Sequence, residues 1–219
     1  FLNEFAPAYQ VILLYALAGV ISLAGWVALG FRPQLAEACR KSAFWLLVFT
    51  FVVHGFALFA RMYLMDRPLV FVTNLYSTAV FIGWTAVGMG LFLERVAPIG
   101  LGNLAAAVVG GGTAIIAHNL AASGDTLEMM QAVLDTNFWL ATHVTTINMG
   151  YAATYVAGVM GLLYIWLGLF TPVLSRTVGG ASRNDTITRV FGQLMYGVLC
   201  LATLLSFVGT VLGGIWADQ

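Results

Sequence analysis

The sequence predicts an all-α fold: a polytopic membrane helical bundle with six transmembrane helices and a short external amphipathic helix. Of its 219 residues, 61% are hydrophobic and only 8% are charged. A soluble domain carries about a quarter charged residues, so this chain has too few charges to cover a surface that faces water. The formal net charge is zero, and no nucleic-acid partner is expected from it.

Six apolar runs are long enough to cross a bilayer. A hydrocarbon core about 30 Å thick needs roughly 20 apolar residues per helix. The runs that meet this length cover residues of about 8–30, 42–64, 74–93, 99–120, 143–170 and 188–216. The connections between them are too short for a soluble domain, and no internal repeat is visible. We therefore expect residues 1–219 to form a single transmembrane domain in contact with the lipid bilayer.

The Lys and Arg residues of the loops predict the orientation, because cytoplasmic loops are enriched in them. One side of the predicted bundle collects seven of the nine basic residues. These seven are Arg32, Arg40, Lys41, Arg95, Arg176, Arg183 and Arg189. Only Arg61 and Arg67 lie on the other side. This bias places both termini and the segment 121–142 outside.

The external segment 121–142 is expected to contain the short amphipathic helix. Asp125 and Glu128 have the spacing of a capping box at a helix start. Apolar residues then recur at helical spacing, as in a helix that lies on the membrane surface. They are Leu127, Met130, Val133 and Leu134.

The start of the fifth span follows directly. Asn137 is expected to cap this helix, and Phe138 and Trp139 are expected to lie in an aromatic belt at the membrane boundary. His143 then lies at the outer end of the span, near the depth of the lipid headgroups.

Three histidines are candidates for a function, because ionisable side chains in membrane spans are costly and mark functional sites by default. The alternative for each is a neutral imidazole that hydrogen-bonds to a neighbouring helix. His54 shares a helix face with Ala57 and Arg61. His118 ends a row of small residues spaced four apart, which lets helices approach closely. The row is Gly102, Ala106, Gly110 and Ala114.

His143 is followed on its own helix face by a further row of small residues. They are Thr146, Gly150, Thr154, Gly158 and Gly161. Ordinary helix packing explains such a row. The functional interpretation is that something flat, such as a haem macrocycle, lies in a groove along this face with the imidazole of His143 as an axial ligand of the iron. The residues alone leave both interpretations open.

Four stretches of the sequence together resemble a known family. They are RPLVFVTNLYSTAVFIGW (67–84), TNFWLATHVTTINMGYA (136–152), FGQLMYGVLCLATLLSFVGTVLGG (191–214) and the terminal IWADQ. They are similar to the CcsA/ResC family of system II cytochrome c biogenesis proteins, members of the haem-handling superfamily named for a Trp-rich WWD segment. The similarity covers most of the chain and is weak before about Val52.

The resemblance implies a function in cytochrome c maturation. Family members carry haem (b-type, in transit) to the external face of the membrane and present it to apocytochrome c, as part of a system II cytochrome c synthase (haem lyase). His143 matches the first of two external histidines that bind the haem iron, and Trp216 matches the first tryptophan of the WWD segment. The implied partner is a CcsB/ResB-like membrane subunit or fused domain. The implied location is the bacterial cytoplasmic (inner) membrane, or the thylakoid membrane for a protein of organelle origin.

The sequence also departs from the family pattern. It ends at Gln219, inside the WWD segment, which is expected of a partial chain, and the second external histidine does not occur in it. The loop before Asn74 is longer than expected of the family.

Three other functions remain open on the residues alone. A b-type electron-transfer membrane cytochrome would pair His118 with His143. A relative from another maturation route would pass haem to a chaperone. A cofactor-free transporter or structural subunit is the third alternative, although the chain has no repeat of the kind usual in transporters.

Overall fold

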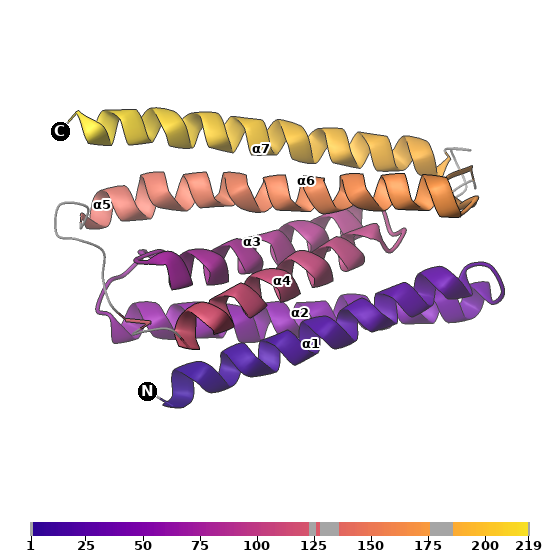
Figure 1. Ribbon diagram of the computed structural model, residues 1–219, viewed down its shortest axis with the longest axis horizontal. Helices are drawn as coiled ribbons and strands as arrows, with labels where there is room; N and C mark the ends of the chain where they lie inside the picture. The colour runs from indigo at the N-terminus through magenta and orange to yellow at the C-terminus, as the bar shows by residue number, and fades with distance from the viewer. Residues whose placement is uncertain (1, 123–125, 128–135, 176–185, 219) are drawn as a thin grey trace.

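The computed structural model describes the whole chain apart from residues 1, 123–125, 128–135, 176–185 and 219 (Figure 1). The long helices are α1 (Leu2–Ala28), α2 (Pro33–Leu64), α3 (Leu75–Val96), α4 (Leu101–Ala122), α6 (Thr145–Phe170) and α7 (Ile187–Ala217). Three short elements complete the described part: α5 (Asn137–Trp139), the π-helix η2 (Leu140–Val144) and the 3₁₀-helix η3 (Val173–Ser175).

The all-α class is confirmed, since six helical stretches of the described residues are long and apolar enough to cross a membrane. The protein is therefore a multi-pass membrane protein. The capping pair Asp125 and Glu128, and most of the expected amphipathic helix, lie outside the described residues. Helix α2 begins at Pro33, well before the apolar run that starts near residue 42. Proline fits the first turn of a helix, which lacks intrahelical N–H partners anyway, so the polar residues before the run are helical too.

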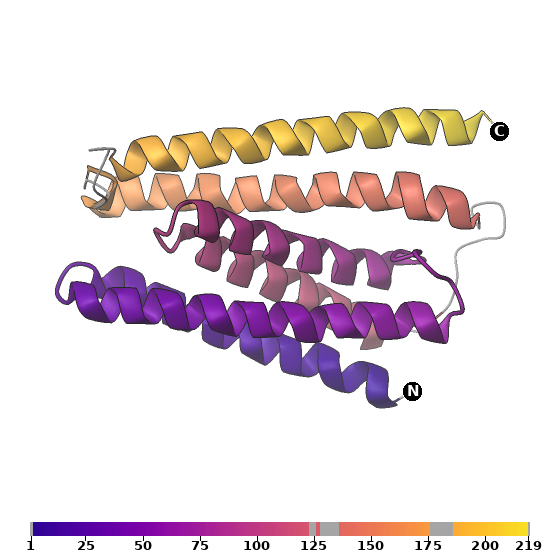
Figure 2. The ribbon, with the colours of Figure 1, turned by 180° about the vertical axis from the view of Figure 1, so that it is seen from behind.

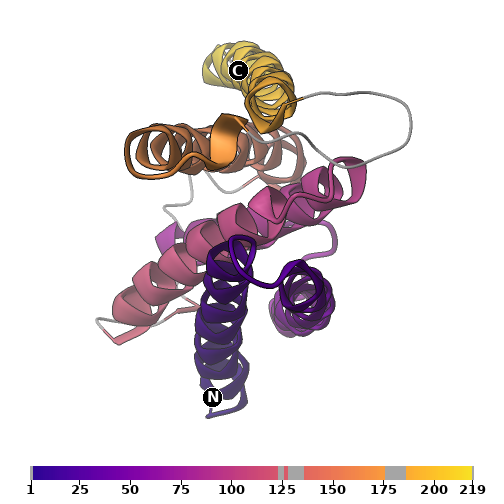
Figure 3. The same ribbon diagram turned by 90° about the vertical axis from the view of Figure 1, so that its right-hand side faces the viewer.

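The six helices form three neighbouring layers. Helices α6 and α7 run side by side along one edge of the bundle, and α1 and α2 pair along the other, with α3 and α4 between them (Figures 1 and 2). The end-on view shows the same order of layers (Figure 3). Both termini lie at the same end of the bundle, together with the α2–α3 connection and α5 (Figures 1 and 2). An even number of spans requires this arrangement of the termini.

Small residues hold α3 and α4 together. A Cβ atom placed on Gly90 would lie 2.7 Å from both the carbonyl oxygen of Gly102 and the Cβ of Ala106. A Cβ on Gly110 would lie 2.6 Å from Val87. The predicted close approach along the row that ends at His118 is therefore confirmed, because larger side chains would push the two helices apart.

The Asn-Leu-Tyr-Ser stretch begins α3 with a reciprocal cap. The Asn74 side chain accepts from the Ser77 N–H at 2.9 Å, and the Ser77 hydroxyl accepts from the Asn74 N–H at 2.9 Å. These bonds satisfy donors that a helix start leaves unpaired. The Asn74 amide and the buried Arg61 guanidinium both donate to the carbonyl of Thr126. The start of α3 is thus tied to α2 and to the segment after α4.

Candidate functional site

His143 lies in the π-helical turn η2, between α5 and α6. The helix is continuous through this turn, so the fifth span begins at Asn137 and His143 lies inside it rather than at its first residue. The Thr145 hydroxyl donates to the carbonyl of Leu140 at 3.2 Å, across the widened turn. A π-turn shifts the register of the side chains that precede it, and such turns are frequent at functional sites. Sequence periodicity gave no sign of it.

The His143 ring is held by the backbone of α7. Its Nδ1 atom lies 2.8 Å from the carbonyl oxygen of Gly209. A carbonyl oxygen only accepts, so Nδ1 carries the proton and donates it. In the neutral ring Nε2 then keeps its lone pair, which is the form of histidine that ligates a metal.

Gly213 of α7 leaves space for the ring, and Gly209 lets α6 and α7 approach each other closely. A Cβ on Gly213 would lie 2.7 Å from Cε1 of His143, and a Cβ on Gly209 would lie 2.9 Å from Ile147. Both distances are shorter than van der Waals contact allows. With Trp216, the two glycines are spaced four and three residues apart and so share one helix face. This spacing is visible in the sequence and is the signal from which the contact with His143 could have been inferred.

One tryptophan packs against the histidine, and a second tryptophan stacks on the first. The rings of Trp216 and His143 lie 5.7 Å apart with an interplanar angle of 56°. Trp139 stacks on Trp216 at 6.3 Å and 17°. Trp139 is only 8% exposed, so its assignment to an aromatic belt is wrong, whereas Phe138 is 66% exposed and suits a belt position. Stacking against the terminal turn of α7 is what buries Trp139.

The expected cap of the fifth span is also different. Thr136 occupies the N-cap position, without a side-chain capping bond, and Asn137 is the first helical residue. The Asn137 side-chain oxygen instead accepts from Arg67 at 3.2 Å. The assignment of Asn137 as the cap is therefore wrong, because its side chain bonds to the α2–α3 connection.

The small residues below His143 do not form one continuous groove. A Cβ on Gly150 would lie 2.8 Å from the Ser206 hydroxyl of α7, so this glycine serves helix packing. Gly158 and Gly161 have nothing within 4 Å of such a Cβ and face open space. Val156 is fully buried between the helices. The predicted groove therefore ends near Gly150, and bulk is restricted at Val156 rather than at Gly158.

A separate apolar cleft begins near the histidine. It has a volume of about 700 Å³ and extends between α3, α6 and α7. Thr145 and Met149, which follow His143 in sequence, form part of its wall. Phe51 and Trp84, stacked at 4.8 Å and 8°, also line it. Aromatic faces of this kind offer flat apolar area to a planar ligand.

The other two histidines are not brought to this site. His54 is 4% exposed, and its Nδ1 lies 2.8 Å from the Tyr15 hydroxyl of α1. It lines a cavity of about 30 Å³ with Ala57 and Arg61, which confirms their shared face but leaves no room for a cofactor. His118 is half-buried near the C-terminal end of α4. The hydrogen bond to α1 accounts for the presence of His54 in a membrane span.

Comparison with known proteins gives a consistent result. The family model described as cytochrome C assembly protein matches residues 72–219. Over 216 residues the chain is 26% identical to protein NrfI of Wolinella succinogenes, which covers 97% of this chain and 22% of that protein. Over 169 residues it is 25% identical to the cytochrome c biogenesis protein CcsA of Synechococcus sp. strain RCC307, and the match covers 68% of this chain and 54% of that protein. It is 24% identical over 169 residues to CcsA of Synechococcus sp. strain CC9902, and that match covers 68% of this chain and 55% of that protein. The chain thus spans from about a fifth to about half the length of these curated relatives.

Proposed function

Because this chain belongs to the cytochrome c assembly protein family, and is thus a membrane protein of cytochrome c biogenesis, we propose that it carries haem to the external face of the membrane and presents it to apocytochrome c. His143 is an axial ligand of the haem iron, and Trp216 packs against the macrocycle. Haem is the cargo of the protein, and the cysteine thiols of apocytochrome c are the second reactant.

The hydrogen bond between Nδ1 of His143 and the Gly209 carbonyl is the observation that carries this proposal. The Nδ1–H group donates to this carbonyl, which orients the ring and leaves Nε2 as the ligating atom. Neutral imidazole is a standard axial ligand of haem iron. The half-buried position of His143 keeps the ring ordered while part of it stays accessible.

The contribution of the chain to the reaction is positioning. Bound haem supplies the vinyl groups, and in each addition the cysteine sulfur bonds to one vinyl carbon while the other takes up a proton. Holding one reactant at a fixed place converts a bimolecular step into an effectively intramolecular one, which is worth roughly 7–11 kcal/mol at best. Trp216, which is half-buried and packs against His143, offers an apolar face to a planar cargo, and Trp139 supports it from behind by stacking.

The proposal also includes the surroundings of the protein. We place it in the bacterial cytoplasmic membrane, with both termini and His143 outside, and beside a CcsB/ResB-like subunit or fused domain. Support for the orientation comes from the basic residues. The α1–α2 connection and the start of α2, whose sequence contains Arg32, Arg40 and Lys41, lie at the end of the bundle opposite α5 (Figure 1).

Cysteine labelling tests the orientation. Pro68 and Gln34 are both exposed, in the α2–α3 connection and the first turn of α2. After replacement of Cys39 and Cys200 by Ser, a membrane-impermeant thiol reagent applied from outside is expected to label Pro68→Cys and not Gln34→Cys. Permeabilised cells should show labelling of both. The opposite pattern in intact cells would place His143 in the cytoplasm and end the proposed role.

Substitution of Gly213 tests the support of the ligand. In Gly213→Val the side chain collides with the His143 ring, so the ring must move and its bond to Gly209 is strained or broken. We expect haem retained on purification to fall by about tenfold, the range found when an outer-shell partner of a ligating histidine is lost. Gly214→Val is the matched control, because a Cβ at Gly214 meets nothing within 4 Å. Equal haem content in the two variants would show that α7 does not position the ligand.

A further inference from the structure

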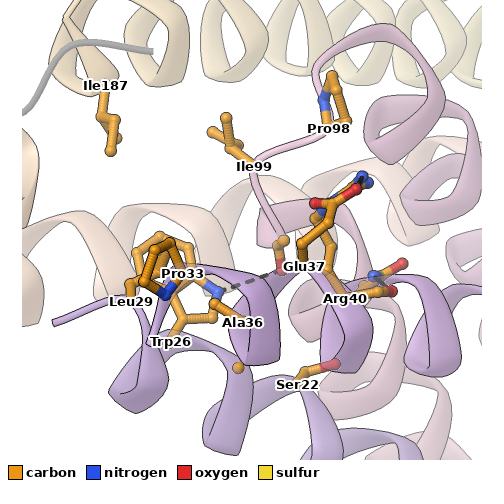
Figure 4. Close-up of a pocket in the computed structure, with 13 residues that line it drawn as sticks. Ser22, Trp26, Leu29, Pro33, Ala36, Glu37, Arg40, Pro98, Ile99 and Ile187 are labelled. Carbon is orange, nitrogen blue, oxygen red and sulfur yellow. Dashed lines mark hydrogen bonds and ion pairs between the residues drawn. The ribbon is translucent and has the colours of Figure 1, made fainter. Parts of the chain in front are cut away.

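A pocket with one polar and one apolar wall lies at the opposite end of the bundle from His143. It has a volume of about 230 Å³ and lies between α1, α2, the α3–α4 connection and the start of α7. Figure 4 shows Ser22, Glu37 and Arg40 on one side of this pocket and Leu29, Trp26 and Ile187 on the other. The pocket therefore combines a polar wall with an apolar one.

The wall formed by the α3–α4 connection is held in place. Gly100 has a φ of +83°, which favours glycine. Its N–H donates to Glu94 at 3.0 Å, and its carbonyl accepts from the Trp26 indole N–H at 3.3 Å. The pocket is thus built by contacts between helices that are distant in the sequence.

The guanidinium of Arg40 is already satisfied by carboxylates. Its Nε and one terminal nitrogen donate to Glu37 at 2.9 and 2.7 Å, and the other terminal nitrogen donates to Glu94 at 3.0 Å. Lys41 makes a further ion pair with Glu37 at 3.2 Å. Two acids and two bases thus compensate one another, and the polar wall of the pocket has no excess charge for an ion.

Two buried oxygen atoms of lining residues lack a hydrogen-bond partner within the described part of the chain. They are Oγ of Ser22, which is 3% exposed, and Oδ1 of Asn103, which is 0% exposed. The Asn103 amide nitrogen donates to the Arg40 carbonyl, which fixes the orientation of the side chain. A buried acceptor without a donor costs about 1–3 kcal/mol. A ligand complementary to this pocket therefore carries uncharged hydrogen-bond donors.

An exposed cation lies next to the pocket in the chain. Arg32 directly precedes Pro33, which lines the pocket, and Arg32 is exposed. Basic residues at the membrane surface attract anionic headgroups, at about 1 kcal/mol per residue. A ligand that fits this site therefore has a neutral hydrogen-bond donor group inside the pocket and an anionic group outside it.

We propose that this pocket binds a glycerol phosphate group, with the two hydroxyls donating to Ser22 and Asn103 and the phosphate on the side of Arg32. The headgroup of phosphatidylglycerol carries this chemistry at the depth where the pocket lies, and soluble glycerol 3-phosphate carries it free in water. The apolar wall of Leu29, Trp26 and Ile187 faces the carbon chain of the headgroup. The site lies at the far end of the bundle from His143 and is independent of haem.

Lipid retention in native mass spectrometry tests the proposal. The protein is purified into micelles that contain equal amounts of phosphatidylglycerol and phosphatidylserine, which have the same net charge but different headgroups. We expect the protein to retain phosphatidylglycerol about tenfold better, as two hydrogen bonds allow. In Ser22→Ala the preference should fall severalfold without loss of folding, because the hydroxyl has no partner within the described residues to lose. Ser42→Ala, at an exposed position of α2, is the matched control and should keep the preference.

A second arm separates charge from hydrogen bonding and identifies the source of the ligand. Arg32→Gln should weaken both lipids alike and leave the preference between them. Glycerol 3-phosphate is also added to the protein in lipid-free micelles. If it raises the thermal stability of the wild type and not that of Ser22→Ala, the site is assigned to the soluble molecule. Equal retention of the two lipids by the wild type, or an unchanged preference in Ser22→Ala, would overturn the proposal and leave a pocket that holds only water.

Discussion

Replacement of His143 by Ala is expected to change the haem absorption spectrum of the purified protein and to abolish attachment of haem to apocytochrome c. The imidazole supplies an axial ligand in the proposed function, and alanine offers no donor atom. Added imidazole should restore the spectrum, because a free imidazole can occupy the vacated position. A purely structural role of the side chain would show no such rescue.

His118→Ala is the matched control for this experiment. His118 lies on α4, whereas the ring of His143 bonds to Gly209 and packs against Trp216, both of α7. We expect the spectrum of His118→Ala to equal that of the wild type. If the protein were a b-type cytochrome with both histidines as ligands, the haem spectrum would change to the same extent in the two variants. A spectrum unaffected by His143→Ala would exclude His143 as the ligand.

Replacement of Arg40 by Met is expected to lower the free energy of unfolding by about 3 kcal/mol, the order found when one partner of a buried ion pair is removed. Glu94 is 1% exposed, and Arg40 is the cation that binds its carboxylate at 3.0 Å. Without Arg40 the buried carboxylate keeps the backbone N–H groups of Gly100 and Asn103 as donors but has no cation beside it. Reversible unfolding in mixed micelles measures the change.

Lys41→Met serves as the control for Arg40→Met. The Lys41 side chain is 66% exposed and pairs with Glu37, which is 47% exposed, at 3.2 Å. Exposed pairs contribute about 1 kcal/mol or less, so this variant should be close to the wild type in stability. If the two variants lost a similar free energy of unfolding, the burial of Glu94 would not be the reason for the loss in Arg40→Met.

Much of the fold could be predicted because membrane spans are local. Twenty apolar residues in a row satisfy the thickness of a bilayer whatever their neighbours are, and each of the six runs became a helix. The runs did not show where the helices end. Residues 33–41 of α2 include Glu37, Arg40 and Lys41, so they interrupt the apolar run although the helix is continuous. A search for apolar runs finds the part of a helix that lies in the hydrocarbon and misses the part that continues beyond it.

The candidate site was predicted only in outline. His143 was identified as an ionisable side chain at the outer end of a span, and Trp216 through the family resemblance. The sequence did not indicate that Trp139 is buried on Trp216 or that Gly158 faces open space. A row of small residues looks the same whether a helix, a ligand or lipid lies against it.

The sequence by itself determined the number of membrane spans and the charge difference between the two ends. These depend on composition and on the order of residues within one segment. Only the tertiary structure decided which ring nitrogen of His143 is free, because the Gly209 carbonyl that takes the proton of Nδ1 comes from a helix 66 residues away. The same holds for the pocket of Ser22 and Asn103, whose walls come from four separate parts of the chain. Such contacts depend on how helices pack, and many packings are compatible with the same set of apolar runs.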